Sequence, residues 1–233
     1  MRSLWRMELG RLDASRLVFV DEMGTHTSLA PIYAYAPIGE RAFFGIPRNR
    51  GKNTTLLTSI HVEGMGPSMA VEGATTARVF ETYVERVLIP TLSPDQLVVM
   101  DNLGAHRPKK IRDLIEERGC ELWYLPSYSP DLNPIEEALS KVKHLLRKIA
   151  ARTKDALIEA MGRALAAVSA EDVRGFFNHC GYRDPAQQLL VARKALAAYL
   201  IISALARSAV TNGTATLGRG SHSVGKLCST IGA

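Results

Sequence analysis

The chain has 233 residues, 46% of them hydrophobic, and a net charge of +6, which suits one domain with a substantial core and room for an appendage. Its three cysteines are far apart and form no CxxC pair, which argues against a disulfide framework and against a zinc ribbon. The charged N-terminus does not read as a secretory signal, and the longest apolar stretch, residues 195–206, is shorter than the roughly 20 residues of a membrane helix. We therefore expect a cytoplasmic protein with no membrane contact.

The positive charge is concentrated at the end of the chain. Five basic residues and no acid follow Asp184, so residues 1–184 carry only +1 of the total. We divide the chain into a main domain, residues 1–184, and a basic, alanine-rich and partly disordered tail, residues 185–233. Any argument that the main domain binds DNA must therefore rest on local patches of charge.

The main domain alternates between strand and helix patterns. The apolar runs at 16–21 and 96–101 are typical of central parallel strands that are buried on both faces, and a helix joins the second run to the next strand. The sequence therefore predicts an α/β fold, with a mixed sheet of about five strands flanked by helices and a helical C-terminal section. The predicted strands are 16–21, 53–62, 67–71, 96–101 and 120–126, and the predicted helices are 75–88, 108–119, 133–150, 153–168 and 170–182.

Two of the predicted strands end on an aspartate. Asp21 closes the first apolar run and Asp101 closes the run in VVMDNLGAHR. Sites in open α/β sheets lie just beyond the carboxyl ends of parallel strands, so we expect the two carboxylates to lie side by side. Such neighbours repel each other unless a cation lies between them, and hard oxygen ligands favour Mg²⁺ or Mn²⁺.

A third acid is predicted at the start of the helix 133–150. Asn133 suits the N-cap position, Pro134 the first helical position and Glu136 the third. We predict that Asp21, Asp101 and Glu136 are catalytic and bind two metal ions, Mg²⁺ or Mn²⁺. Such a pair of ions grips the attacking and leaving oxygens of a phosphoryl displacement.

Each acid has a plainer alternative. Asp21 can cap a turn, and Asp101 before Asn-Leu-Gly can belong to turn chemistry alone. Glu136 can be a capping-box glutamate with no catalytic role, and Glu137 competes with it as the metal ligand.

Three motifs, in this order and spacing, resemble the DDE endonuclease domain of bacterial insertion-sequence transposases in the mariner-like superfamily. They are VFVDEMG, VVMDNLGAHR and YLPSYSPDLNPIEEALSKVK, and the resemblance covers about residues 16–182. The resemblance implies a ribonuclease H-like fold, with Asp21, Asp101 and Glu136 as the metal-binding triad. It also implies that Asn102 and His106 match the polar residues that follow the second acid in the family, where they would contact and orient the metal ligands.

The same resemblance implies an activity and partners. The reaction would be metal-dependent cleavage of DNA at transposon ends, followed by attack of a 3′-hydroxyl on target DNA, usually at a TA dinucleotide. We expect a dimer or higher oligomer on DNA, and therefore a nucleoid-associated protein. Members usually carry a helix-turn-helix region before the first strand, and here that strand begins near residue 16. We therefore expect an upstream helix-turn-helix partner frame.

Two other functions stay open at this point. One is a catalytically silent transposase remnant that binds DNA or a full-length partner, which the short N-terminal region allows. The other is a plain ribonuclease H-like nuclease, against which the proline-rich SPDLNPIEE stretch argues.

Basic residues outside the motifs suggest where DNA phosphates would bind. Residues 45–53 resemble a phosphate-binding loop, but five residues separate Gly45 from Gly51 where the motif has four. A strand also follows where the motif requires a helix. We expect sequence-independent phosphate contacts instead, with an ordinary solvated surface as the alternative. The aromatic residues Trp123, Tyr124 and Tyr128 are expected to pack in the core rather than stack on bases. The predicted DNA-binding residues are Arg48, Arg50, Lys52, Lys141, Lys143, Arg147 and Lys148.

Overall fold

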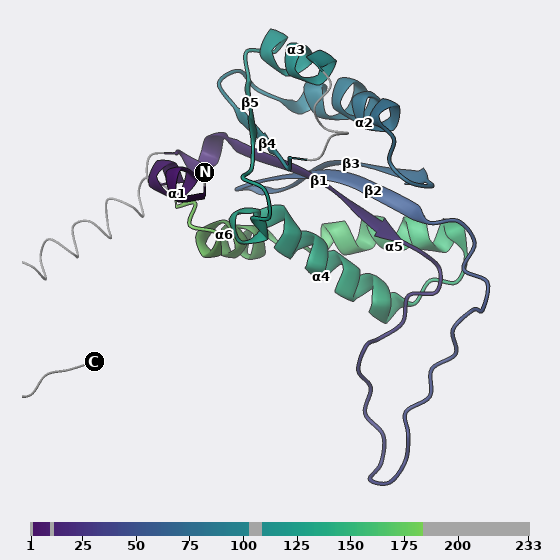
Figure 1. Cartoon of the computed structure of the whole chain (residues 1–233). Coiled ribbons are helices and arrows are strands. Elements are labelled where there is room, and N and C mark those ends of the chain that lie inside the picture. The colour runs from purple at the N-terminus through teal and green to yellow at the C-terminus, as the bar shows by residue number, and fades with distance from the viewer. Residues whose placement is uncertain (1, 10–11, 103–108, 184–233) are drawn as a thin grey trace, which may run out of the picture. The chain divides into compact units, whose positions relative to one another are not determined.

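A computed structural model describes residues 2–9, 12–102 and 109–183, and within these ranges the chain forms one five-stranded sheet in the order β3-β2-β1-β4-β5 (Figure 1). β1, β4 and β5 run parallel, whereas the β2–β3 hairpin is antiparallel to β1. This sheet confirms the predicted mixed α/β architecture. The strands are β1 (Leu17–Thr25), β2 (Thr54–His61), β3 (Gly64–Glu72), β4 (Leu97–Met100) and β5 (Glu121–Tyr124).

Helices cover both faces of the sheet (Figure 1). One face packs against α4, α5 and α6, and the other against α2 and α3. The segment after α2 continues as a π-helical turn, Val84–Leu88, and a 3₁₀ turn, Ile89–Thr91. The helices are α1 (Arg2–Leu9), α2 (Ala77–Tyr83), α3 (Lys109–Glu117), α4 (Pro134–Ile149), α5 (Lys154–Ala166) and α6 (Ala170–His179).

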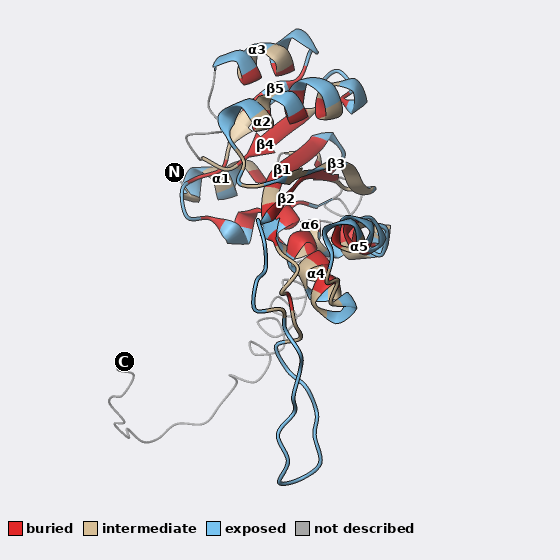
Figure 2. Cartoon of the chain, turned by 90° about the vertical axis from the view of Figure 1, so that its right-hand side faces the viewer, coloured by how far each residue is buried: buried red, intermediate tan, exposed pale blue. Residues whose placement is uncertain are grey.

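Alternation along β1 divides the core into two clusters, one on each face of the sheet. Val18 and Val20 pack in the cluster with α2 and α3, whereas Leu17 and Phe19 pack in the cluster with α4, α5 and α6. Figure 2 shows the buried strands between the two helical layers. Burying each such side chain stabilises the fold by about 1.5–3 kcal/mol, so this pattern fixes which side of β1 faces α4.

Hydroxyl side chains set the start of three helices. Thr76 accepts a hydrogen bond from the backbone N–H of Val79 at the start of α2, and Thr153 begins α5 in the same way. α6 begins with a complete capping box, in which Ser169 and Asp172 satisfy each other's backbone N–H groups. These caps explain why the predicted helix starts are correct to within two residues.

A long excursion, residues 26–53, leaves the sheet between β1 and β2 and projects past α4 and α5 (Figures 1 and 2). Arg152 links the start of the excursion to the rest of the domain. Its Nη1 donates hydrogen bonds to the carbonyls of Thr27 and Leu29 at 2.8 and 2.9 Å. The Arg152 guanidinium also lies over the Phe44 ring, 5.3 Å from its centre. Further out, large apolar side chains are strongly exposed, namely Ile32, Tyr33, Tyr35, Ile38 and Phe43.

Two strand boundaries differ from the predictions by three or more residues. β1 continues four residues past Asp21, because its pairing with β2 extends to Thr25 opposite Thr54. β3 begins at Gly64, three residues before the predicted start at residue 67. The predicted tail, residues 185–233, lies outside the described residues. In the part of the chain that the structure does describe, no helix has the length and apolar character needed to cross a membrane.

Candidate active site

Asp21 and Asp101 occupy matching positions on neighbouring parallel strands. The pairing of β1 with β4 ends with Val20 opposite Met100, so one further step along each strand reaches Asp21 and Asp101. Because side chains alternate along a strand, both acids fall on the face to which Phe19 points, which α4 covers. Asp21 lies within the ladder opposite Thr58 of β2, so it does not cap a turn.

The Asp21 carboxylate is buried, with 7% of the residue exposed. Its Oδ1 accepts a hydrogen bond from the backbone N–H of Glu22 at 2.7 Å, and its Oδ2 accepts one from Asn133 Nδ2 at 3.2 Å. A buried carboxylate is costly unless hydrogen bonds, an ion pair or a metal compensate for the lost water. These two contacts hold the acid in place and fix its direction.

The start of α4 differs from the starts of α2, α5 and α6. Asn133 occupies the N-cap position, but its side chain makes no capping hydrogen bond and donates to Asp21 instead. The capping box that would give Glu136 a purely structural role is therefore not formed. Pro134 and Glu136 lie in the first turn, as predicted, and the backbone N–H of Glu136 bonds to the Asn133 carbonyl at 3.1 Å. Thus one residue, Asn133, joins the helix that carries Glu136 to the strand that carries Asp21.

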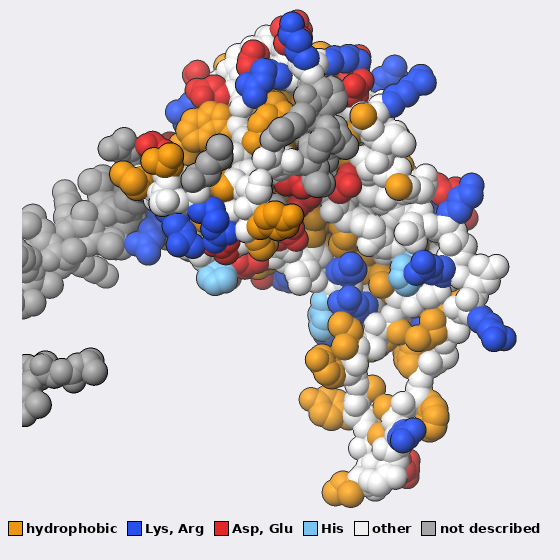
Figure 3. Space-filling view, viewed as in Figure 1, with side chains coloured by type: hydrophobic (Ala, Val, Ile, Leu, Met, Phe, Trp, Pro, Cys, Tyr) orange, Lys and Arg blue, Asp and Glu red, His pale blue; other side chains and the backbone are white. Residues whose placement is uncertain are grey.

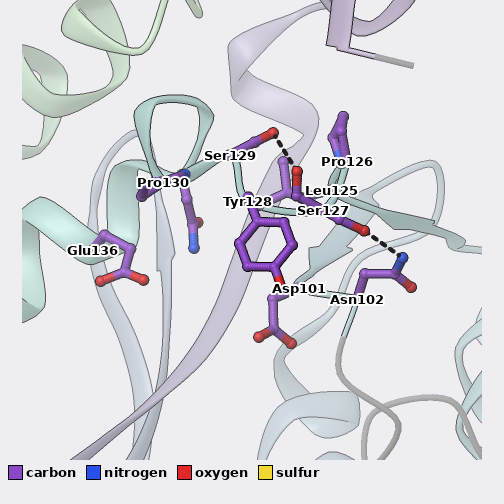
Figure 4. Close-up of a pocket in the computed structure, with 10 residues that line it drawn as sticks. Asp101, Asn102, Leu125, Pro126, Ser127, Tyr128, Ser129, Pro130 and Glu136 are labelled. Carbon is purple, nitrogen blue, oxygen red and sulfur yellow. Dashed lines mark hydrogen bonds between the residues drawn. The ribbon is translucent and has the colours of Figure 1, made fainter.

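Asp101 and Glu136 line the same cavity, which has a volume of about 460 Å³ (Figure 4). In Figure 4 Glu136 lies at the start of α4 on one side of the cavity, and Asp101 lies on the other. Asn133, the partner of Asp21, is also part of the lining. The remaining lining residues are Asn102, Leu125, Pro126, Ser127, Tyr128, Ser129 and Pro130.

The chemistry of this donor set fits a hard divalent cation, because it consists of carboxylates and an amide. Within the described ranges, however, no three Asp, Glu, His or Cys side chains lie close enough together to enclose a metal ion. Asp101 and Glu136 line the cavity directly, whereas Asp21 is linked to it through Asn133.

The residues near the triad are placed as follows. Asn102 lines the cavity and its Nδ2 donates to Ser127 Oγ at 3.4 Å, whereas His106 lies outside the described residues. Glu137 hydrogen-bonds to His179 of α6, and this hydrogen bond, with the charge of Glu137, raises the pKa of His179. Because Glu137 faces α6, it is a weaker candidate for a metal ligand than Glu136.

A second hollow, of about 350 Å³, begins on the other side of Glu136. Its lining includes Lys143 and Arg147 of α4, with Glu22 of β1. Burial lowers the pKa of His26, at the base of the excursion, and the charges of Arg50 and Lys143 lower it further. Lys143 and Arg147 thus lie beside Glu136, and together with Arg50, which lies near His26 as Lys143 does, we call them the basic strip. Figure 3 shows Lys and Arg side chains over α4, below the acidic centre of this face.

The other predicted DNA-binding residues are more dispersed. Arg48 and Lys148 are exposed, the former on the excursion and the latter near the end of α4. Lys52 lies 3.8 Å from a Glu72 carboxylate oxygen. Lys141 forms an ion pair with Asp172 of α6, which engages its ammonium group within the helical layer.

The prediction that three aromatic residues pack in the core is wrong for one of them. Trp123 and Tyr124 pack against the two core clusters, as expected. Tyr128 is 97% exposed and lies on the cavity lining, with a φ of 54° that non-glycine residues rarely adopt. The proline-rich stretch around it signals a fixed, irregular segment but does not reveal which way its side chains point.

The chain is a mixed α/β domain with two acids that line one cavity, and sequence comparison gives its family. A family described as DDE superfamily endonuclease matches residues 16–158, which is more than half of the chain. The chain therefore belongs to the DDE superfamily endonucleases. A search among curated proteins found no match.

Solved structures of similar fold come from the Mos1 mariner transposase. The pre-cleavage Mos1 transpososome has a TM-score of 0.64 at 18% identity, over 77% of this chain and 57% of that one. The Mos1 paired-end complex with Mn has a TM-score of 0.62 at 20% identity, over 77% and 56% of the two chains. The isolated Mos1 catalytic domain has a TM-score of 0.58 at 18% identity, over 77% and 84%. The likeness confirms the ribonuclease H-like fold, and the chain spans little more than half of the transposase in the complexes.

Proposed function

We propose that this chain is a transposase catalytic domain that cleaves DNA strands and transfers a 3′-hydroxyl to target DNA, with Asp21, Asp101 and Glu136 as the metal-binding acids. The observation that carries the proposal is the common placement of these acids. Two share one register position on parallel strands, and the third begins the helix that covers the same face. Membership of the DDE superfamily endonucleases supports the same reaction class.

The three carboxylates would hold two Mg²⁺ or Mn²⁺ ions, which supply Lewis-acid stabilisation of the phosphate oxygens during the displacement. Asn133 keeps the Asp21 carboxylate turned toward α4 through its hydrogen bond. Asn102 supports the opposite side of the cavity through Ser127. The structures of Mos1 with Mn and with Mg support the choice of metal by analogy.

DNA would approach along the basic strip, where positive side chains adjoin the triad. Lys143 and Arg147 flank Glu136, so phosphates bound there would lead into the cavity without any reading of sequence. The resemblance extends the proposal to a TA target dinucleotide and to an upstream helix-turn-helix region that reads transposon ends.

The excursion supports assembly into an oligomer on DNA. Its apolar side chains are more exposed than a solvated loop requires, which is typical of a surface that a partner covers. The paired-end and transpososome complexes of Mos1 support an assembly of this kind.

Plasmid nicking in the presence of Mn²⁺ tests the proposal, with Asp101→Ala as the inactive variant and Asp155→Ala as a control acid on α5. We expect nicking by the wild type and by Asp155→Ala, and none by Asp101→Ala. Unchanged DNA binding with no nicking by the wild type would favour the catalytically silent remnant. Nicking without joining of a 3′-hydroxyl end to target DNA would favour the plain nuclease.

A further inference from the structure

One side of the cavity is lined by residues 126–130. They belong to the segment between β5 and α4, residues 126–132, which we call the wall segment. Helix α1, distant in sequence, reaches this segment through Arg2. Arg2 Nη1 donates to the Tyr128 carbonyl at 2.6 Å and to Ser129 Oγ at 3.0 Å. Arg2 Nη2 donates to both carboxylate oxygens of Asp131, at 2.8 and 2.9 Å. A single guanidinium thus holds three residues of the wall segment.

A second arginine strengthens this attachment. Arg6, one helical turn after Arg2, donates from Nη2 to Asp131 Oδ2 at 3.0 Å. Guanidinium groups bind carboxylates in a fixed planar geometry, so the pair constrains direction as well as distance. The hydrogen bonds from Arg6 and Arg2 outweigh the effect of burial and lower the pKa of Asp131, which keeps the carboxylate charged.

The backbone conformation of Tyr128 explains why contacts from outside the wall segment are needed to stabilise it. Its φ of 54° is left-handed, a conformation that costs free energy for a residue with a side chain. The Tyr128 carbonyl is one of the groups that Arg2 binds. The contact therefore favours the backbone conformation that leaves the Tyr128 side chain on the cavity lining.

An aromatic chain attaches α1 to the end of the wall segment. Trp5 Nε1 donates to the Tyr182 hydroxyl at 3.0 Å, and that hydroxyl donates to the Leu132 carbonyl at 2.8 Å. Trp5 also meets Trp123 of β5 edge to face, with ring centres 5.6 Å apart. The next residue after Leu132 is Asn133, which holds Asp21.

We propose that α1 is a positioning element for the active site, in which Arg2, Arg6 and Trp5 fix the wall segment and, through Asn133, the relative placement of Asp21 and Glu136. The inference rests on the proposed function, because it assumes that this cavity is where DNA is cut. The hydrogen bonds of these three residues go to the wall segment and to Tyr182, so their role is indirect.

The ion pairs of α1 are too exposed to contribute much to the stability of the fold. The side chains of Arg2, Arg6 and Asp131 are 41%, 59% and 44% exposed, and ion pairs this exposed contribute little to the free energy of unfolding. Turnover, by contrast, is sensitive to small shifts of the groups that hold a reacting phosphate. A displacement of about 1 Å lowers a rate by as much as about 100-fold.

The test compares Arg2→Ala/Arg6→Ala with the control Arg112→Ala/Arg163→Ala in the full chain. The control removes the same charge from two exposed helical ion pairs, with Glu116 and Glu159. Three quantities are measured for each variant: amide hydrogen exchange of residues 127–133, affinity for a DNA duplex in Ca²⁺, and the single-turnover rate of cleavage in Mn²⁺.

We expect the α1 variant alone to exchange faster at residues 127–133 and to cleave about 10- to 100-fold more slowly. Its DNA affinity and melting temperature should match those of the control. Exchange and cleavage equal to the control would overturn the proposal. If the double variant does not fold, Arg2→Lys, which keeps the charge but not the forked geometry, provides the same comparison. If the wild type cleaves no DNA, the proposed function fails, whereas hydrogen exchange still decides whether α1 holds the wall segment.

Discussion

The two faces of the sheet use the same strands for different purposes. On the face covered by α2 and α3, the alternate positions of β1 are Val18 and Val20, which lie in a hydrophobic core. On the face covered by α4, the series runs Leu17, Phe19 and then Asp21, so a carboxylate follows two core residues in the same phase. The acid appears at the point where pairing with β4 ends. An acid thus interrupts a series of packed side chains, which resumes at Met23.

The same contrast recurs within the first turns of α4. Ile135 and Ala138 are fully buried in the core cluster, whereas Glu136 lines the cavity. Under the proposed function, neighbouring residues of one helix therefore serve stability and chemistry separately. Substitutions that distinguish the two roles can break or sharpen this comparison.

The largest expected effect comes from the acid of α4. Glu136→Gln should lower the rate of DNA cleavage by about 10³-fold, because Lewis-acid stabilisation contributes several kcal/mol to the transition state. Glu137→Gln, the adjacent control, should cleave at nearly the wild-type rate, because Glu137 faces His179. Single-turnover cleavage of a labelled duplex in Mn²⁺ measures both. Equal losses in the two variants would mean that the cavity-facing side of α4 has no special role.

A smaller effect is expected from the residue that links the two elements. Asn133→Ala removes the hydrogen bond to Asp21 without removing a helix cap, because its side chain makes no capping bond. We expect cleavage to fall about 10- to 100-fold, as for other residues that orient metal ligands. The exposed Asn178→Ala serves as the control. A large loss of stability with normal cleavage per folded molecule would contradict the positioning role.

Substitutions in the basic strip should alter DNA binding more than chemistry. Lys143→Ala/Arg147→Ala is expected to reduce the slope of log affinity against log salt by about 1 for each phosphate that the variant no longer binds. Lys141→Ala, on the same helix, should leave this slope unchanged, because Lys141 is paired with Asp172. Fluorescence anisotropy over a salt series measures the slopes. Identical slopes for both variants and the wild type would place the DNA elsewhere.

The smallest expected effect is on the pH dependence of stability, through Asp172 in the helical layer of α4 and α6. The hydrogen bond from Lys141, followed by those from Ser169, lowers the pKa of Asp172 from 3.8 to about 2. A lowered carboxyl pKa contributes stability above pH 3.8 that is lost as the pH falls through about 2. The difference in melting temperature between wild type and Asp172→Asn should therefore narrow from pH 6 to pH 2. A constant difference would mean that the ionised form of Asp172 is not what stabilises α6.

The sequence predicts the strand order in the chain and the register of the two aspartates, because apolar runs ending on Asp21 and Asp101 leave few alternatives. It also places Glu136 at a helix start, since Pro134 and its neighbours define that turn. It does not predict that Asn133 turns to Asp21 instead of capping α4, or that Tyr128 is exposed. Those outcomes depend on long-range contacts that no local pattern encodes.

Binding of Mn²⁺ in the absence of DNA tests the central claim most directly, because it asks whether the three acids act as one site. Electron paramagnetic resonance titration should find about two bound ions per wild-type chain, and weaker binding in each of Asp21→Asn, Asp101→Asn and Glu136→Gln. Glu137→Gln should bind as the wild type does. Wild-type binding in the Glu136→Gln variant would show that α4 contributes no ligand, and would contradict the account.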